Sequence, residues 1–315
     1  MKKEELRIVY MGTPDFAVSP LKRIIEDGYN VVGVVTVADK PAGRGRKLRQ
    51  SPVKQYADKL GIKTLQPIKL KDPIFLEELS SLKANIQIVV AFRMLPEIVW
   101  NMPPLGTFNL HASLLPNYRG AAPINWALIN GEEFTGVSTF FLKHEIDTGN
   151  ILLQRKVAID NKDTAGSLHD KLMLTGSDLV VETLDQIIEN KITAIAQDKA
   201  PYADQSIKEA PKLFKEDCRI DFSKKTRDVY NFIRGLSPYP AAFTEVKLAN
   251  GEDKLLKIFS VEESDRKGSV GEYSVIDGEI FFFTDDGAIK INELQLEGKK
   301  RMLSTDFLRG TRLAD

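Results

Sequence analysis

The feature that most constrains the fold is an alternation of short apolar runs and amphipathic stretches between residues 6 and 92. LRIVYM (6–11), VVGVVTV (31–37) and IQIVVAF (86–92) are apolar, β-branched-rich runs, and FAVSPLKRIIEDG and SPVKQYADKLG between them have helical periodicity. Continuous apolar strands that alternate with helices are typical of parallel strands buried on both faces. The pattern predicts an α/β domain with a doubly wound, mostly parallel sheet.

Further elements extend this domain toward residue 190. We expect strands at GTFNLH (106–111) and GVSTFFL (136–142), with a helix at APINWALINGE between them and another from about Thr164 to Glu189. Residues 191–208 contain a proline and small residues without clear periodicity, which predicts a linker.

After residue 208 the sequence pattern changes from alternating strands and helices to mainly short strands. One helix is expected near 225–236, where Val229, Phe232, Ile233 and Leu236 share a face. Short strands follow, broken by the dipeptides Asn250-Gly251, Asp277-Gly278 and Asp286-Gly287, which favour hairpin turns because they tolerate positive φ. A small β-barrel or sandwich is predicted. The expected boundaries are a first domain at 1–190, a linker at 191–208 and a β-rich domain at 209–315.

Length, charge and cysteine content limit the class of protein. The 315 residues are enough for two domains, and 44 basic against 44 acidic residues give a net charge of zero, so a polyanion must be met by a local patch. The single cysteine, Cys218, excludes an internal disulfide and a Cys-rich metal site. The start MKKEELRIVYMG lacks the apolar run of a signal peptide or membrane helix, so we expect a cytoplasmic protein without membrane contact.

Two loops contain residue types that are common in ligand-binding sites. In Gly12-Thr13-Pro14-Asp15, Thr13 is expected to cap the following helix, but neither this loop nor any other has a dinucleotide or P-loop fingerprint. The loop DKPAGRGRKLRQSPVK is strongly basic, which suits a phosphate backbone and equally describes a solvated charge run. Its cations are Lys40, Arg44, Arg46, Lys47, Arg49 and Lys54.

The strongest cluster of polar residues begins within the carboxyl end of the predicted strand at 106–111. Asn109 and His111 are two residues apart, so they project from the same face near the strand's carboxyl end, and Asp147 stands in a later loop. Ligands of open α/β sheets bind at that edge. We expect the other two histidines, His144 and His169, to be surface or helix-packing residues.

An Asn, a His and an Asp at a strand end fit a metal site, a hydrolytic site or an acyl-transfer site. The residues narrow this choice only in part. One His and one Asp are few for zinc, no H-E-x-x-H occurs, and the nucleophile elbow G-x-S-x-G of many serine hydrolases is absent. These absences favour chemistry in which the substrate brings the nucleophile and the protein supplies hydrogen bonds and charge.

At these residues the chain resembles the folate-dependent formyltransferases. The motifs that carry the resemblance, in order, are MGTPDFAV (11–18), PAGRGRKL (41–48), SPVK (51–54), NLHASLLPNYRGAAPI (109–124) and DTG (147–149). The resemblance implies a Rossmann-like catalytic domain followed by an OB-like, tRNA-binding domain. It also implies formyl transfer from 10-formyltetrahydrofolate, as co-substrate, to the α-amino group of methionine on initiator tRNA, without a metal. We expect a monomer.

The resemblance also assigns site residues. It implies that Asn109, His111 and Asp147 are catalytic. The loop at 91–96 is one residue shorter than is usual in the family and contains Arg93, so only its place beside the folate carries over. The residues implied to line the folate site are Ser113, Leu114, Leu115, Pro116, Phe92, Met94 and Leu95, and those implied to contact tRNA are Arg44, Gly45, Arg46, Lys47 and Arg49.

Three alternatives differ in what they leave unexplained. A sugar-nucleotide formyltransferase shares N-x-H, S-L-L-P and a second domain but gives the basic loop no ligand. A purine-pathway formyltransferase would lack the last hundred residues. A non-catalytic RNA-binding protein would explain the basic loop and the β-rich domain, but not the three polar residues at 109, 111 and 147.

Overall fold

The computed structural model describes residues 2–42, 47–203 and 207–314, which fall into two units that interleave along the sequence. The first unit contains residues 1–120, 135–157 and 169–209. The second contains residues 121–134, 158–168 and 210–315.

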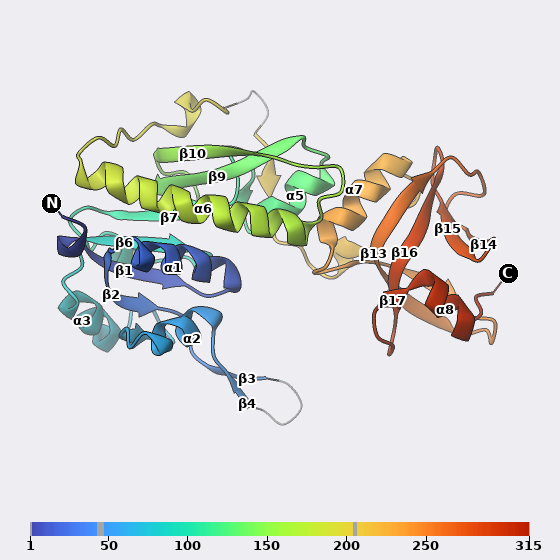
Figure 1. The fold of residues 1–315 in the computed structure, drawn as a ribbon, viewed down its shortest axis with the longest axis horizontal. Helices are drawn as coiled ribbons and strands as arrows, with labels where there is room; N and C mark the ends of the chain where they lie inside the picture. The colour runs from blue at the N-terminus through green and yellow to red at the C-terminus, as the bar shows by residue number, and fades with distance from the viewer. Residues whose placement is uncertain (1, 43–46, 204–206, 315) are drawn as a thin grey trace. The chain divides into compact units, whose positions relative to one another are not determined.

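One sheet of seven strands forms the centre of the first unit, in the order β10-β9-β7-β6-β1-β2-β5 (Figure 1). Adjacent strands from β5 to β7 are parallel, and β9 runs antiparallel to β7. The predicted mostly parallel sheet is therefore confirmed. The strands are β1 (Arg7–Gly12), β2 (Asn30–Val35), β5 (Thr64–Leu65), β6 (Ile86–Val90), β7 (Thr107–His111), β9 (Phe134–Phe141) and β10 (Ile151–Ala158).

Helices cover both faces of this sheet, as a doubly wound fold requires. On one face Val9 and Val89 pack with buried residues of α3 and α4. On the other face Leu110 meets α6, where a Cβ added at Gly176 would lie 2.8 Å from the Leu110 Cδ2. The helices and helical turns are η1 (Lys3–Glu5), η2 (Asp15–Ala17), α1 (Val18–Glu26), α2 (Pro52–Lys59), α3 (Pro73–Ser81), α4 (Glu97–Trp100), α6 (Ala165–Ile188) and η3 (Gln197–Lys199).

Local chemistry explains where two of these helices begin. The side chains of Ser51 and Asp72 each accept a hydrogen bond from a backbone amide of the following helix, at 3.1 and 3.0 Å, and a proline stands next. The expected cap at Thr13 is wrong. Pro14 directly precedes the 3₁₀ turn η2, and no side chain caps that turn.

The strand order places the site. The chain runs from β1 to β2 and β5, and then crosses to the other side of β1 to form β6 and β7. The sheet therefore reverses its winding between β1 and β6, and ligands of such sheets bind outside the carboxyl ends of the strands near this point. Gly12, Val90 and His111 are the last residues of β1, β6 and β7.

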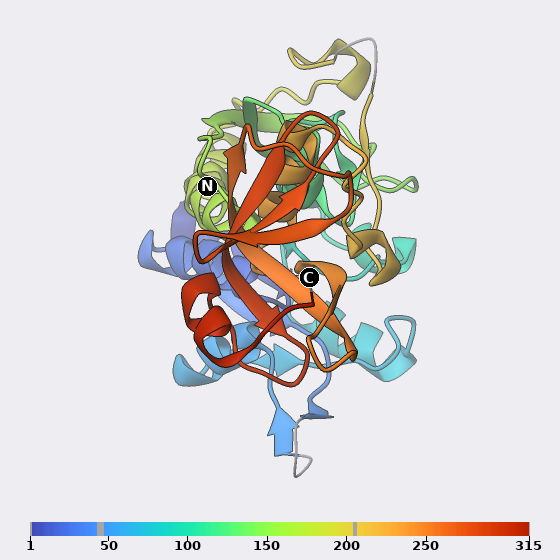
Figure 2. The ribbon, with the colours of Figure 1, turned by 90° about the vertical axis from the view of Figure 1, so that its right-hand side faces the viewer.

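The second unit contains an antiparallel sheet in the order β12-β13-β16-β15-β14, with β17 paired to β16. Its strands fan out with a strong twist (Figure 2). Asp277 and Gly278 both have positive φ, 54° and 78°, and join β14 to β15 as predicted. The strands are β12 (Ala242–Lys247), β13 (Asp253–Ser264), β14 (Tyr273–Ile276), β15 (Glu279–Phe283), β16 (Ala288–Leu296) and β17 (Met302–Leu303).

The predicted apolar face of the helix near 225–236 packs into the core of this unit. Val229, Ile233 and Leu236 are buried there, and Phe232 packs against the same cluster. Segments distant in sequence join the unit, since the Asn125 amide donates to the Gly235 carbonyl at 2.7 Å. The boundaries expected at 190 and 209 stay a prediction. The helices and helical turns are α5 (Pro123–Ile129), η4 (Glu216–Cys218), α7 (Thr226–Leu236) and α8 (Ser304–Gly310).

Two further pairs of short strands complete the described elements. β3 (Lys40–Ala42) and β4 (Lys47–Arg49) form a hairpin in the first unit. The two-residue strands β8 (Arg119–Gly120) and β11 (Glu209–Ala210) stand where the chain passes between units. Across the described part of the chain, we find no helix with both the length and the apolar character needed to cross a membrane.

Candidate active site

Strand β7 presents Asn109 and His111 on one face, because side chains alternate along a strand. Leu110 between them points to the opposite face, against α6. In the neighbouring strands Asn109 is level with Val89 of β6 and Phe140 of β9. The shared face expected for Asn109 and His111 is thus present, at the edge where the carboxyl ends of β6 and β7 meet.

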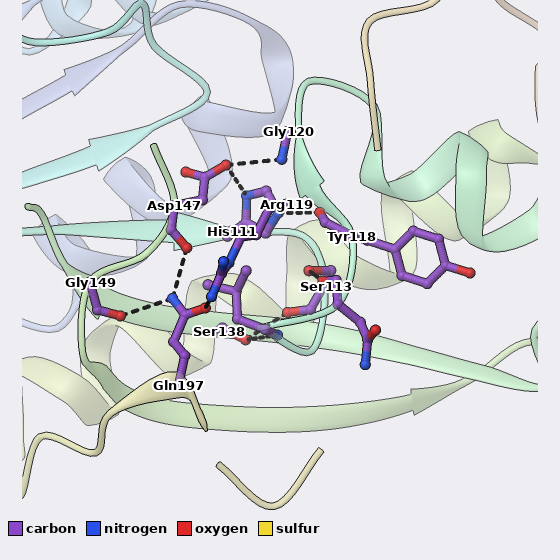
Figure 3. A network of polar contacts seen from close by, with 11 residues as sticks. His111, Ser113, Tyr118, Arg119, Gly120, Ser138, Asp147, Gly149 and Gln197 are labelled. Carbon is purple, nitrogen blue, oxygen red and sulfur yellow. Dashed lines mark hydrogen bonds and ion pairs between the residues drawn. The ribbon is translucent and has the colours of Figure 1, made fainter. Parts of the chain in front are cut away.

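Hydrogen bonding fixes the orientation of the His111 ring (Figure 3). Its Nε2 lies 2.8 Å from the backbone carbonyl oxygen of Tyr118. A carbonyl oxygen only accepts, so Nε2 must carry the hydrogen and the neutral ring has its lone pair on Nδ1. That Nδ1 faces Asp147, with 3.9 Å to Oδ2, and both side chains are largely buried, at 8% and 13% exposure.

The Asp147 loop has an unusual backbone. Asp147 has φ of 53°, in the left-handed region that costs a non-glycine residue about 1–2 kcal/mol. The backbone amide of Gly120 donates to Asp147 Oδ2 at 3.1 Å, and the Gln197 side-chain amide donates to the Asp147 carbonyl at 2.7 Å. The same Gln197 nitrogen lies 2.9 Å from the Gly149 carbonyl oxygen. Contacts from two other segments therefore stabilise this conformation.

Asn109 has a buried atom whose hydrogen-bonding capacity is unused. Within the described residues its Oδ1 is buried and has no hydrogen-bond partner. An unpaired buried acceptor costs about 1–3 kcal/mol, so a group that brings a donor would be favoured there. The same amide, turned over, would present its NH₂ group to a carbonyl oxygen. Asn109 thus fits a ligand that carries an amine or a carbonyl.

The segment after β7 is held rigidly by Ser138 of β9. The Ser138 hydroxyl donates to the Ser113 carbonyl at 2.6 Å and accepts from the Leu115 amide at 3.1 Å. The Ser113 hydroxyl donates to the Asn117 carbonyl at 2.6 Å. Leu114 and Leu115 are buried. These contacts point the segment's side chains into the protein, and its folate contacts stay a prediction.

The loop at 91–96 lies beside the carboxyl end of β6. Leu95 is buried, Phe92 packs against the same core cluster, and Met94 is 75% exposed. The Arg93 guanidinium donates to the carbonyls of Pro67 and Ile68, so this unusual residue anchors the loop to the neighbouring segment. The folate contacts expected of Phe92, Met94 and Leu95 stay a prediction.

The basic loop is described only in part. Arg44, Gly45 and Arg46 lie outside the described residues, Lys47 is the first residue of β4, and Arg49 is exposed. At the base of the hairpin, Asp39 pairs with the Lys54 amine at 2.6 Å and accepts from the Gln66 amide at 2.7 Å. Lys54 is therefore committed to an ion pair within the protein. The tRNA contacts of this loop stay a prediction.

Comparison with known proteins places this geometry in a family. The model of the formyl transferase domain matches residues 6–184, and the model of the formyl transferase C-terminal domain matches residues 212–312. The chain belongs to the formyl transferase family. The resemblance inferred from the motifs is confirmed.

Similar proteins align with the whole length of this chain. A methionyl-tRNA formyltransferase of Bacteroides fragilis is 55% identical over all of this chain and 98% of its own length. One of Phocaeicola vulgatus is 57% identical with the same coverage.

Solved structures share the fold at low identity. HypX from Aquifex aeolicus in complex with tetrahydrofolic acid has a TM-score of 0.65 and 19% identity, over 96% of this chain and 46% of its own. An N-formyltransferase from Helicobacter canadensis, in complex with folinic acid and dTDP-3-aminofucose, has a TM-score of 0.65 and 21% identity, over 96% of this chain and all of its own.

Three residues that the sequence analysis did not single out contribute to the site. Tyr118 and Gly120 act through backbone atoms, which no side-chain pattern reveals, although both lie inside the NLHASLLPNYRGAAPI motif. Gln197 lies in the stretch interpreted as a linker and had no sequence signal. No cluster of three or more metal-binding side chains occurs in residues 2–42, 47–203 and 207–314.

Proposed function

We propose that this formyl transferase moves a formyl group from 10-formyltetrahydrofolate to the α-amino group of methionine on initiator tRNA. The amine nitrogen would bond to the formyl carbon, the bond from that carbon to folate N10 would break, and the proton lost by the amine would end on N10. The observation that carries the proposal is the pair Asn109 and His111 at the carboxyl end of β7, with Asp147 beside the ring.

Asn109 and His111 have complementary roles in this reaction. Addition of the amine puts negative charge on the formyl oxygen, and Asn109 would donate a hydrogen bond to it, a kind of interaction whose loss typically costs about 10²- to 10³-fold in rate. Because His111 Nε2 is bonded to the Tyr118 carbonyl, the ring would act through Nδ1. Asp147, at 3.9 Å from Nδ1, would stabilise the protonated ring while the proton passes from the amine to N10.

The choice of acceptor rests on the close relatives. Proteins 47–57% identical over nearly the full chain are methionyl-tRNA formyltransferases, whereas two solved sugar formyltransferases are 20% and 17% identical. The basic hairpin around β3 and β4 would suit the phosphate backbone of tRNA, with Arg44, Gly45, Arg46, Lys47 and Arg49 in contact. We further propose a cytoplasmic monomer whose residues Ser113–Pro116, Phe92, Met94 and Leu95 line the folate site.

A formyl-transfer assay tests the proposal directly. With 10-formyltetrahydrofolate as donor, we expect the wild type to formylate charged initiator tRNA and to leave a nucleotide amino sugar unchanged. His111→Ala should lower single-turnover formylation by about 10²-fold or more, because the ring that carries the proton is lost.

His169→Ala is the matched control, since His169 lies in α6 and packs against Phe16. It should keep wild-type turnover. Near-normal single-turnover rates in a folded His111→Ala protein would exclude the assigned role of His111. Preferred use of the amino sugar would replace the proposed acceptor.

A further inference from the structure

A buried glutamine behind the catalytic loop has no part in the chemistry proposed above. Gln197 is the first residue of η3, and its side chain is 4% exposed. Its amide nitrogen donates to the backbone carbonyls of Asp147, at 2.7 Å, and Gly149, at 2.9 Å. Both donors of the amide are therefore used on the two residues that flank Thr148.

The oxygen of the Gln197 amide also forms hydrogen bonds within the protein. Its Oε1 accepts from Nε of Arg119 at 2.9 Å and from Nη2 at 2.5 Å. A guanidinium only donates and a backbone carbonyl only accepts, so these partners leave a single orientation for the amide. Gln197 thus connects the Asp147 loop to Arg119 through both ends of its side chain.

Arg119 lies between the two residues that hold the proposed catalytic pair. The carbonyl before it, on Tyr118, accepts from His111, and the amide after it, on Gly120, donates to Asp147. The contacts therefore form a closed ring through residues 118–120, Gln197, the Asp147 loop and His111 (Figure 3).

The separation of His111 and Asp147 makes this ring sensitive to small movements. At 3.9 Å, Asp147 Oδ2 is outside hydrogen-bonding distance of Nδ1, yet a shift of about 1 Å would bring the two atoms together or remove the interaction. The left-handed backbone of Asp147 also needs contacts to hold it. Gln197 supplies two of them, one on Asp147 itself.

We propose that Gln197, held by Arg119, is a positioning residue that fixes the Asp147 loop relative to His111. This inference rests on the proposed function for its effect on rate. It assigns Gln197 no contact with either substrate, so the expected defect lies in turnover and not in substrate binding.

Gln197→Met tests the role, because methionine has a similar length and no amide. We expect kcat for formyl transfer to fall about 10- to 100-fold, as for other loss of positioning contacts, with KM for folate and tRNA unchanged. Gln197→Glu is the second variant. It keeps an acceptor for Arg119 and loses both donors to the loop, so it should be as slow as Gln197→Met. A changed KM with an unchanged kcat would overturn the proposal.

Two readouts separate positioning from a general structural effect. The chain has three histidines, so their imidazole ¹⁵N signals can be assigned, and in Gln197→Met the His111 signal should move while that of His169, in α6, stays unchanged. In an Asp147→Asn background, Gln197→Met should lower kcat little further, because both changes remove the same interaction, that between Asp147 and His111. Additive losses, or an unmoved His111 signal with normal kcat, would refute the role.

The spectroscopic readout also separates this inference from the proposed function. If the wild type failed to formylate methionyl-tRNA, the proposed function would fail, while the His111 signal in Gln197→Met would still report whether Gln197 holds the loop.

Discussion

At the scale of single residues, Gly149 lies so close to the backbone of Phe141 that no side chain fits there. A Cβ added at Gly149 would lie 1.6 Å from the Phe141 carbonyl oxygen, which no side-chain adjustment relieves. We therefore expect Gly149→Ala to displace the Asp147 loop and lower kcat for formyl transfer by about 100-fold, the scale of a displacement near 1 Å.

The control is Gly61→Ala, at a position with φ of 68° and nothing within 4 Å of the added Cβ. It should cost about 1 kcal/mol of stability through backbone strain and leave kcat unchanged. Equal kcat in the Gly149 and Gly61 variants would show that the loop tolerates the displacement.

Sequence periodicity predicts some site residues but not those that act through backbone atoms or through contacts with distant segments. Asn109 and His111 could be placed on one face because a strand repeats every two residues. Tyr118 and Gly120 contribute a carbonyl and an amide that every residue possesses, so their identity carries no signal. Gln197 contacts a loop about fifty residues earlier in the chain, and no local pattern encodes such a contact.

At the scale of elements, helix α7 begins on a cap that comes from another element. Asp286, in the turn between β15 and β16, accepts from the backbone amide of Thr226 at 2.7 Å and from its hydroxyl at 2.8 Å. These hydrogen bonds hold the pKa of the Asp286 carboxyl below its ordinary value. The dipeptide Asp286-Gly287, predicted only as a turn, thus also stabilises a helix sixty residues earlier.

The lowered pKa of Asp286 predicts a pH-dependent contribution to stability. The contribution is complete above the ordinary carboxyl pKa and disappears as pH falls through the lower folded-state pKa, because the carboxylate must then take up a proton. Asp286→Asn keeps an acceptor but does not titrate. Its urea midpoint should lie below that of wild type at a pH of about 7, and the difference should shrink as pH falls below about 3.9, the ordinary aspartate pKa, until the folded-state carboxylate is protonated. A difference that is constant with pH would contradict this.

At the scale of the whole molecule, the interleaving of the two units is the part of the fold that the sequence did not reveal. The helices at 164–189 and 225–236 were predicted because each has an amphipathic pattern. Residues 158–168 nevertheless belong with the second unit, although they lie well before residue 209. Membership of a unit depends on tertiary contacts between distant segments, such as those of Arg234, and periodicity does not report them.

Arg234 of α7 joins two distant segments within the second unit. It is 6% exposed, and its guanidinium donates to Asn231 Oδ1 at 2.8 Å and to the carbonyls of Asp160 and Asp163 at 3.1 and 3.2 Å. We expect Arg234→Met to lower the free energy of unfolding of this unit by about 1–3 kcal/mol, because the buried Asn231 Oδ1 and the buried Asp163 carbonyl would each lose a donor.

The two tryptophans allow this change to be measured in the second unit itself. The Trp126 indole donates to the Pro211 carbonyl at 2.8 Å, and both residues belong to that unit, whereas Trp100 belongs to the first. In a Trp100→Phe background, the urea midpoint from Trp126 fluorescence should fall in Arg234→Met. Arg309→Met removes a 79% exposed side chain that pairs with Asp306 along the surface of α8, and it should shift stability by at most about 0.5 kcal/mol. Equal shifts for the two variants would mean that the carbonyls of 160 and 163 find other donors, and that Arg234 does not hold 158–168 in the second unit.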